Sequence, residues 1–341
     1  MTVVDTPVVL APMAGGPTTV DLVAAVTGAG GFGFLAGAYL TPDRLRHQVR
    51  ELRSRTQRPF GVNIFAPSPD DPGKQQQAEA YAGLLAPWAA AAGVTLGTPR
   101  WDDDWFGDKV AVLAEERPAL VSFAFAWPPA DVVDALQRVG IEVWTTVNDP
   151  AEVAWAAELG VDGVIAQGWE AGGHRGGPVD SGDRQPDVRD LVQALRSASR
   201  LPVMAAGGVM DASGARDLLD LGATGVAFGT AFLASDEAGT APVHRDALTT
   251  RHGTVVTRAF TGRSARALTT SWTAQFTEGA PAAYPHVHHL TAPLRAYGKA
   301  TGQAELVHLW AGTGHASTRS APAATIVRGL LEGIRAASSA P

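Results

Sequence analysis

Short apolar runs alternate with amphipathic stretches along most of the chain. The runs are rich in Val, Ile, Leu, Phe and Ala, and such continuous apolar segments are typical of the buried strands of a parallel sheet. Eight such strands are predicted, at 8–13, 32–36, 60–65, 120–125, 142–147, 164–167, 202–206 and 225–232.

Helical patterns separate these runs. The predicted helices cover 18–29, 42–55, 129–139, 150–159, 188–198 and 211–221, with Thr18 or Thr19 and Thr41 as N-caps. Eight strand–helix units favour a closed (β/α)8 TIM barrel over an open doubly wound sheet. The glycine-rich strand ends follow strands six to eight rather than strand one, which also favours the barrel.

Two segments are longer than a barrel needs. Residues 67–119 contain a predicted helix at 75–92 and the acids Asp102, Asp103 and Asp104, which are interpreted as a solvated helix N-terminus rather than a metal site. Residues 236–312 are expected to form a small, mainly helical insert domain over the barrel mouth. The barrel domain would then comprise 1–235 plus 313–341, with 324–336 as its eighth helix.

Composition narrows the class of protein. The 341 residues include 27 basic residues for a net charge of −7, contain no cysteine, and have no apolar run of about 18 residues. No signal peptide is recognised at the start of the sequence. We therefore expect a cytoplasmic enzyme, monomer or homodimer, that binds neither nucleic acid nor a membrane.

The loop after the sixth strand, 168–176, carries the most chemistry. It combines glycines with Glu170, His174 and Arg175. Glycines allow backbone N–H groups to approach a ligand, and imidazole is the side chain suited to proton transfer near neutral pH. His174 is therefore the candidate catalytic residue. Glu170 and Arg175 are expected to pair or to brace the loop.

Strands seven and eight also end in small residues. Gly207, Gly208, Gly229 and Thr230 lie where barrels commonly bind a phosphate through backbone N–H groups. A phosphorylated cofactor such as FMN, or a sugar phosphate, would fit such a site. The fingerprint glycines of dinucleotide folds and P-loops are missing from the required positions.

Two polar residues interrupt otherwise apolar strands. The amides of Asn63 and Gln167 need partners when buried, either a ligand ring or a neighbouring loop. The segment from Ala11 to Gly16, which includes Met13, leaves room for a flat ring.

Taken together, these segments resemble the class I nitronate monooxygenases. The resemblance rests on Ala11–Gly16, 31–37, 60–65, 121–123, 167–176 and 206–208, and it extends over nearly the whole chain. It implies a TIM barrel with FMN bound non-covalently, and oxidation of alkyl nitronates by O₂ to a carbonyl compound and nitrite, with neutral nitroalkanes left open as substrates. The site residues that it implies are His174 for catalysis and Ala11, Met13, Asn63, Gln167, Gly172, Gly173, Gly207, Gly208, Gly229 and Thr230 for the cofactor.

The resemblance has departures and competitors. Thr270 and Thr313 stand where members typically have Asn and Gln, and both are expected near the cofactor or the mouth. An FMN- and NAD(P)H-dependent enoyl-acyl-carrier-protein reductase and a non-catalytic flavin-binding module are the alternative functions. His286, His288 and His289 are placed on an exposed loop of the insert, without a metal.

Overall fold

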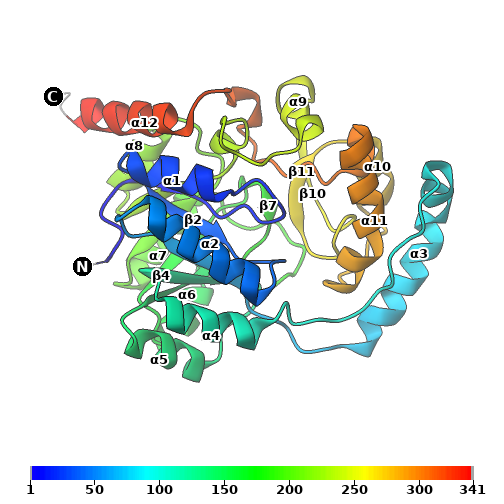
Figure 1. The fold of residues 1–341 in the computed structure, drawn as a ribbon, viewed down its shortest axis with the longest axis horizontal. Coiled ribbons are helices and arrows are strands. Elements are labelled where there is room, and N and C mark those ends of the chain that lie inside the picture. Colours follow the sequence, from blue (N-terminus) through cyan, green and yellow to red (C-terminus); the bar gives the residue numbers. More distant parts are fainter. Residues whose placement is uncertain (1, 339–341) are drawn as a thin grey trace.

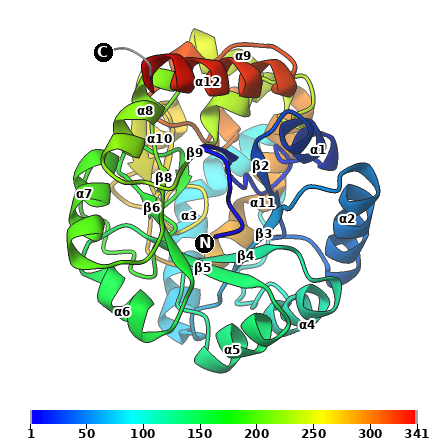
Figure 2. The same ribbon diagram turned by 90° about the vertical axis from the view of Figure 1, so that its left-hand side faces the viewer.

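The computed structural model describes residues 2–338 and contains a closed barrel of eight parallel strands. Figure 2 looks along this barrel. Its strands are, in order around the barrel, β1 (Val8–Leu10), β2 (Phe32–Ala36), β3 (Gly61–Phe65), β4 (Leu120–Ala124), β5 (Glu142–Val147), β6 (Gly163–Gln167), β8 (Val203–Ala206) and β9 (Gly225–Phe228). The predicted fold class is confirmed, and the sheet is closed because β9 pairs with β1.

A ring of helices surrounds the strands (Figure 2). Thr19 and Thr41 cap the first two by accepting from Leu22 N and Arg44 N, as predicted. The C-terminal helix closes the ring between α8 and α1, which confirms it as the eighth barrel helix. The ring consists of α1 (Val20–Gly28), α2 (Pro42–Arg55), α4 (Phe106–Glu116), α5 (Ala130–Arg138), α6 (Glu152–Glu158), α7 (Val188–Ala198), α8 (Ala212–Asp220) and α12 (Ala323–Ser338).

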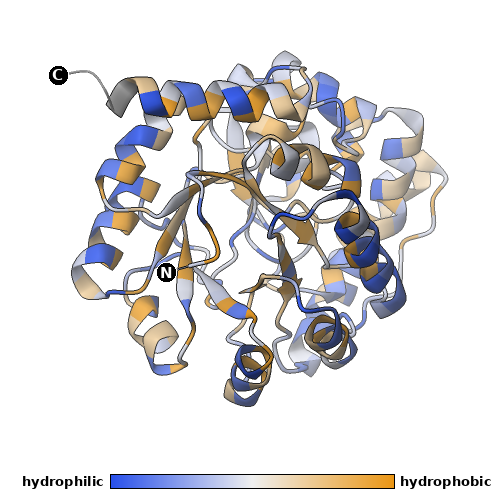
Figure 3. Cartoon of the chain, turned by 60° about the vertical axis from the view of Figure 1, so that its left-hand side comes forward, coloured by the Kyte–Doolittle hydropathy of each residue, from blue (hydrophilic) through white to orange (hydrophobic). Residues whose placement is uncertain are grey.

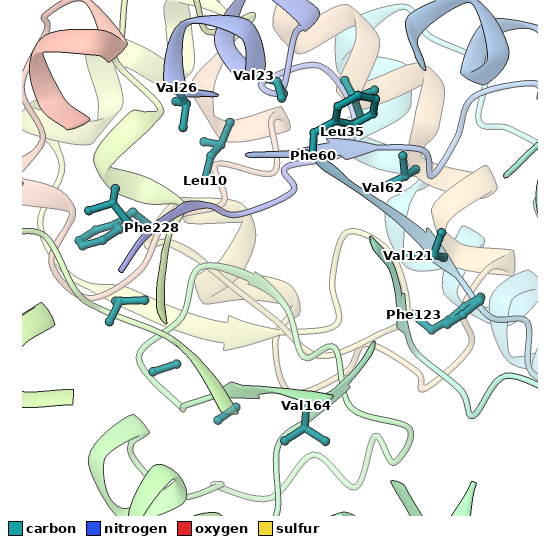
Figure 4. Packing of buried hydrophobic residues seen from close by; sticks show 14 of the residues in the cluster. Leu10, Val23, Val26, Leu35, Phe60, Val62, Val121, Phe123, Val164 and Phe228 are labelled. Carbon is teal, nitrogen blue, oxygen red and sulfur yellow. The ribbon is translucent and has the colours of Figure 1, made fainter. Parts of the chain in front are cut away.

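Alternation along the strands divides the core into two layers. Side chains such as Leu10 and Val62 point outward and pack against α1 and its neighbours (Figure 4). Phe34 and Trp144 point into the barrel, where Gly61 and Gly163 leave them room, because a Cβ at either glycine would lie 2.5 Å from an aromatic carbon. Figure 3 shows this arrangement as hydrophobic strands inside helices that carry polar residues on one face.

A second layer covers one end of the barrel. It includes α9 (Pro242–Thr250), α10 (Ser271–Phe276), α11 (His286–Thr301) and a three-stranded sheet of β7 (Gly173–His174), β10 (Thr254–Thr257) and β11 (Ala265–Leu268). Short 3-10 helices lie at Thr230–Phe232 (η1), Ala304–Leu306 (η2) and His315–Ser317 (η3). The insert segment thus has strands as well as helices, and its predicted boundaries stay a prediction.

Helix α3 (Pro72–Ala92) joins this second layer although it comes from the segment between β3 and α4. It lies beside α11, away from the barrel helices (Figure 1). Tyr81 and Leu85 of α3 share one buried cluster with Trp272 and Leu290. Two segments far apart in the sequence therefore form one cover. Within residues 2–338 no helix has the length and apolar character needed to cross a membrane.

Candidate active site

A cavity of about 480 Å³ opens at the carboxyl ends of the barrel strands, between the barrel and the second layer. This size is typical of small-molecule sites. Every residue that the sequence singled out for catalysis or cofactor binding lines it: Ala11, Met13, Asn63, Gln167, Gly172, Gly173, His174, Gly207, Gly208, Gly229 and Thr230.

The polar strand residues reach the cavity because side chains alternate along a strand. Asn63 follows the inward-facing Gly61 by two positions, and Gln167 follows the inward-facing Ile165 in the same way. Both therefore point into the barrel at its open end.

The two amides have different partners. Asn63 Nδ2 donates to the carbonyl and the hydroxyl of Ser122 at 3.1 and 2.9 Å, and its Oδ1 accepts no hydrogen bond from the described residues. Gln167 is occupied at both ends, since Oε1 accepts from Gly176 N at 2.8 Å and Nε2 donates to the carbonyl of His174 at 2.9 Å. Asn63 thus retains an acceptor for a ligand, while Gln167 holds the loop that carries His174.

His174 lies on the two-residue strand β7, which pairs antiparallel with β11 through Ala265. Its Nε2 lies 2.9 Å from Thr261 Oγ1. The rings of Phe125 and Trp310 stand 5.3 and 5.2 Å away, centroid to centroid. The imidazole is thus held on several sides at the wall of the cavity.

The environment of His174 disfavours the imidazolium. Burial, followed by the charges of Arg263 and Arg295, lowers the pKa of His174 from 6.5 to about 3. The ring is therefore neutral across the physiological pH range in the free protein. A bound anion would offset these effects, because an opposite charge nearby favours the protonated form.

Three arginines brace the loop around His174. Arg175 is 1% exposed and its Nη2 donates to the carbonyls of Gln167 and Gly168 at 2.9 and 2.7 Å. Arg263 Nε donates to the carbonyl of Arg175 at 2.9 Å, and Arg266 Nε donates to that of Trp169 at 3.0 Å. The loop is therefore held by charge-assisted hydrogen bonds to its backbone, which are stronger than neutral ones.

Glu170 and Arg175 do not form an ion pair with each other. The Glu170 carboxylate accepts from Val188 N, the first residue of α7, at 3.0 Å. Burial raises the pKa of Glu170. Both side chains therefore brace the loop, which is one of the two predicted roles, and they do not pair.

Glycine is required by geometry at the end of β8. Gly207 and Gly208 have φ values of +135° and +68°, a region that other residues rarely adopt. A Cβ at Gly208 would lie 2.8 Å from Glu170 Cβ and 3.2 Å from Thr313 Oγ1. Any side chain at Gly208 would therefore crowd the wall of the site.

At the end of β9, Gly229 directly precedes the 3-10 helix η1, which begins at Thr230. Thr230 Oγ1 accepts from Gly312 N at 2.9 Å, so its own O–H is left to donate. A Cβ at Gly172 would lie 2.5 Å from the same Gly312 N. The loops after β6 and β9 thus converge on the 310–313 segment.

One face of the cavity was not predicted from the sequence, and its cationic groups are Arg295 and Lys299. Arg295, Lys299, His244, His288 and His308 line it from the second layer, and no carboxylate of the described chain does so. On α11, His288, Arg295 and Lys299 follow the helical spacing of seven and four residues, a signal that could have been found. Pro293 lies inside the same helix, between His288 and Arg295.

The placement of three histidines on an exposed loop is wrong. His286, His288 and His289 lie in the first turn of α11. His286 is buried, and His288 stacks on Tyr39 with ring centroids 4.4 Å apart. They are covered because α11 packs between α3 and the cavity. Among residues 2–338, no three His, Asp or Glu side chains gather as metal ligands would.

The acidic run is less solvated than predicted. Asp104 forms an ion pair of 2.7 Å with the buried Lys109 and accepts from Tyr39 N. Asp102 Oδ2 lies 2.5 Å from His289 Nε2 on α11. The three acids do precede helix α4, but two of them hold specific partners, Asp104 within the barrel and Asp102 on α11.

The two departures from the family pattern have different positions. Thr270 is the N-cap of α10, where it forms a capping box with Thr273, and it does not line the cavity. The expectation that Thr270 lies near the site is therefore wrong. Thr313 N donates to the carbonyl of Glu170, and its hydroxyl lies beside Gly208. Only Thr313 stands next to the glycine pair of β8.

Comparisons with known proteins agree with this geometry. The family model for nitronate monooxygenase matches residues 2–333. The chain is 38% identical to a nitronate monooxygenase of Pseudomonas aeruginosa over 343 residues, with 97% of each chain covered. It is also 38% identical to one of Paraburkholderia phytofirmans, covering 96% of this chain and 92% of the relative.

Solved structures are similar over the whole length. The fold matches that of nitroalkane oxidase from Streptomyces ansochromogenes with a TM-score of 0.95 and 41% identity, covering 99% and 98% of the two chains. FabK from Thermotoga maritima matches with a TM-score of 0.77 and 27% identity, covering 98% and 94%. The chain is thus an oxidoreductase, and it belongs to the nitronate monooxygenase family.

Proposed function

We propose that this protein oxidises alkyl nitronates with O₂ to a carbonyl compound and nitrite, using FMN held at the barrel mouth. The observation that carries the proposal is the cavity itself. It brings His174 together with Arg295 and Lys299 and is lined by no described carboxylate, and such a site favours anionic ligands.

The residues present fit FMN. The positive φ values of Gly207 and Gly208 and the hydroxyl of Thr230 suit a phosphate at the ends of β8 and β9. Asn63 Oδ1 is available for an N–H group of a ring, and Ala11 and Met13 border the same space. When bound, FMN would supply the acceptor for electrons from the nitronate and the route to O₂.

His174 has two possible tasks that its surroundings allow. Thr261 Oγ1 lies 3.4 Å from the carbonyl of Arg263, to which it donates. When Thr261 donates in this way, His174 Nε2–H donates to Thr261 and Nδ1 keeps its lone pair; in the other tautomer Thr261 donates to Nε2. A neutral imidazole can take the α-proton of a nitroalkane, or it can orient a nitronate that arrives already deprotonated.

The low pKa of His174, about 3, supports nitronates over neutral nitroalkanes as the main substrates. A weak base is poorly matched to a carbon acid, because efficient general-base catalysis needs a pKa near the operating pH. A preformed nitronate needs no such step.

The first prediction is that the purified protein carries FMN rather than FAD. The proposal assigns one phosphate cradle, at the ends of β8 and β9, and the sequence has no second nucleotide fingerprint. Acid release followed by chromatography measures this directly. Recovery of FAD, or of no flavin from folded protein, would contradict the cofactor assignment.

One anaerobic experiment separates the alternative functions. The protein is mixed with excess NADPH or with ethyl nitronate while the flavin spectrum is recorded. Reduction of the flavin by ethyl nitronate but not by NADPH supports the proposal. Rapid bleaching of the flavin by NADPH supports the reductase alternative. No response to either compound would leave the non-catalytic flavin-binding module.

A further inference from the structure

Arg295 is a buried cation without an acidic partner. It lies on α11, is 8% exposed, and lines the cavity. No described Asp or Glu lies within ion-pair distance of its guanidinium. Burying a charge is costly unless hydrogen bonds or an opposite charge compensate it. Arg175 and Arg263 are compensated by carbonyls of the loop around His174, whereas Arg295 faces the cavity, where a bound anion would complete it.

The guanidinium is held in a set orientation by its own helix. Nε donates to Thr291 Oγ1 at 3.0 Å, and Nη2 donates to the carbonyl of His288 at 2.7 Å. The ring of His288 is in turn stacked on Tyr39. Nη1 forms no hydrogen bond with any of residues 2–338. Nε and Nη2 of the guanidinium are thus held in place, and the N–H groups of Nη1 are left for a ligand.

Arg295 also lies within electrostatic reach of His174. Its charge is among the causes that lower the pKa of His174. Burial lowers the pKa of Arg295 itself only to about 10, so the guanidinium stays charged at neutral pH. An anion bound to Nη1 would therefore lie in the same cavity as the imidazole.

We propose that Arg295 is the residue that receives the planar, negatively charged NO₂ group of the nitronate, and that it makes the site select anionic nitronates over neutral nitroalkanes. This inference rests on the proposed function. A guanidinium binds planar oxyanions through parallel N–H groups, which a point charge such as an ammonium does not reproduce. Arg295 is thus a specificity residue, distinct from His174.

The test compares Arg295→Gln, Arg295→Lys and the wild type at constant ionic strength. Nitrate serves as the probe because it is a planar oxyanion, and its binding can be measured without turnover. Its binding is measured by isothermal titration calorimetry on the protein as purified. In parallel, KM is measured for ethyl nitronate and for nitroethane, which share a carbon skeleton and differ in charge.

We expect Arg295→Gln to weaken nitrate binding about 10- to 100-fold and to raise the KM for ethyl nitronate by a similar factor, as for loss of a charge-assisted hydrogen bond. The KM for nitroethane should change far less. Arg295→Lys should recover part of the nitrate affinity. Arg251→Gln is the matched control, because Arg251 is already paired with Glu305 and does not line the cavity.

Several results would overturn the inference. Unchanged nitrate affinity in folded Arg295→Gln would show that Arg295 does not bind the anion. The same conclusion would follow if the variant lost FMN but still bound nitrate. Equal losses on ethyl nitronate and nitroethane would assign it a structural role. A wild type that binds nitrate through Arg295 but does not oxidise nitronates would support the anion site and contradict the proposed function alone.

Discussion

At the scale of single residues, the site depends on groups whose charge state is set by burial. His174 is neutral because the protonated ring would be desolvated and would face two arginines. Asn63 and Gln167 look alike in sequence, yet only Asn63 keeps a free acceptor. Residue type therefore indicates the chemistry, while the local partners decide how it is used.

The prediction that belongs to this scale is the effect of His174→Asn. If His174 takes the α-proton, kcat/KM for nitroethane should fall ~10²–10⁴-fold, the usual contribution of general-base catalysis. Activity on ethyl nitronate should fall much less, because that substrate arrives deprotonated. Steady-state kinetics on both substrates, with FMN content as the folding control, measure the difference.

The pH profile provides a second readout for the same variant. A base must be neutral to act, so the lowered pKa of His174 predicts that wild-type kcat/KM for nitroethane shows no acidic limb near pH 6.5. A limb near pH 6.5 that disappears in His174→Asn would show that the ring titrates with an ordinary pKa. Equal losses on both substrates would instead assign His174 to binding the anion.

At the scale of elements, two short segments position the chemistry. Strand β7 has only two residues, and its pairing with β11 places His174 on the cavity wall. The end of β8 has two glycines with positive φ, beside the loop that carries Glu170. Both segments act through backbone geometry. Arg175, Arg263 and Arg266 stabilise the loop that carries His174 by donating to its carbonyls.

Gly208→Asp is the prediction for the end of β8. The variant places a side chain in a strained backbone conformation and a carboxylate beside the proposed phosphate. At about 4 Å and an effective dielectric near 20, this repulsion is worth roughly 4 kcal/mol. We expect FMN affinity to fall by about 10²–10³-fold.

Fluorescence titration of the flavin-free protein with FMN measures that change. Gly214→Ala is the control, because Gly214 lies in α8 and an added Cβ there would meet only ordinary contacts of 3.4 Å or more. Undiminished FMN content in folded Gly208→Asp would show that the phosphate lies elsewhere.

At the scale of the whole molecule, the second layer turns the barrel mouth into an enclosed, basic cavity. It fully or partly covers five histidines whose pKa values are all lowered, chiefly by desolvation: His174, His244, His286, His288 and His308. In the unfolded chain each would take up a proton near pH 6.5. The same burial that builds the site therefore makes the fold sensitive to acid.

The sign of this pH dependence follows from proton counting. Below about pH 6.5 the unfolded state binds more protons than the folded state, so stability falls as the pH drops. His174 and His244, with pKa values of about 3 and about 4, should each cost about 2 kcal/mol by pH 5. Urea unfolding midpoints at pH 7.5, 6 and 5 measure the loss.

One variant isolates the histidine contribution. Buried carboxyls with raised pKa values, namely Asp104, Glu152 and Glu170, act in the opposite direction. His308→Asn removes one lowered histidine and leaves those carboxyls in place, so its stability should depend less steeply on pH. If the urea midpoint of His308→Asn depended on pH as steeply as that of the wild type, His308 would not be buried in its neutral form.

What the sequence determined by itself was the barrel and the ends of its strands. Hydrophobic periodicity is local, so the strands and most helices could be predicted within a few residues. The glycine-rich strand ends located the cavity, because the carboxyl ends of parallel strands meet at one face. His174, Asn63 and the glycine pair at 207–208 were found in this way.

Only the tertiary structure decided which side chains face His174, Asn63 and the glycine pair. Arg263 and Arg175, which lie 88 residues apart in the chain, meet in a hydrogen bond that no periodicity predicts. Helix α11 also depends on distant partners, since His288 stacks on Tyr39 and His289 pairs with Asp102. Contacts between distant segments set burial, and burial in turn sets the charge of His174 and the need of Arg295 for an anion.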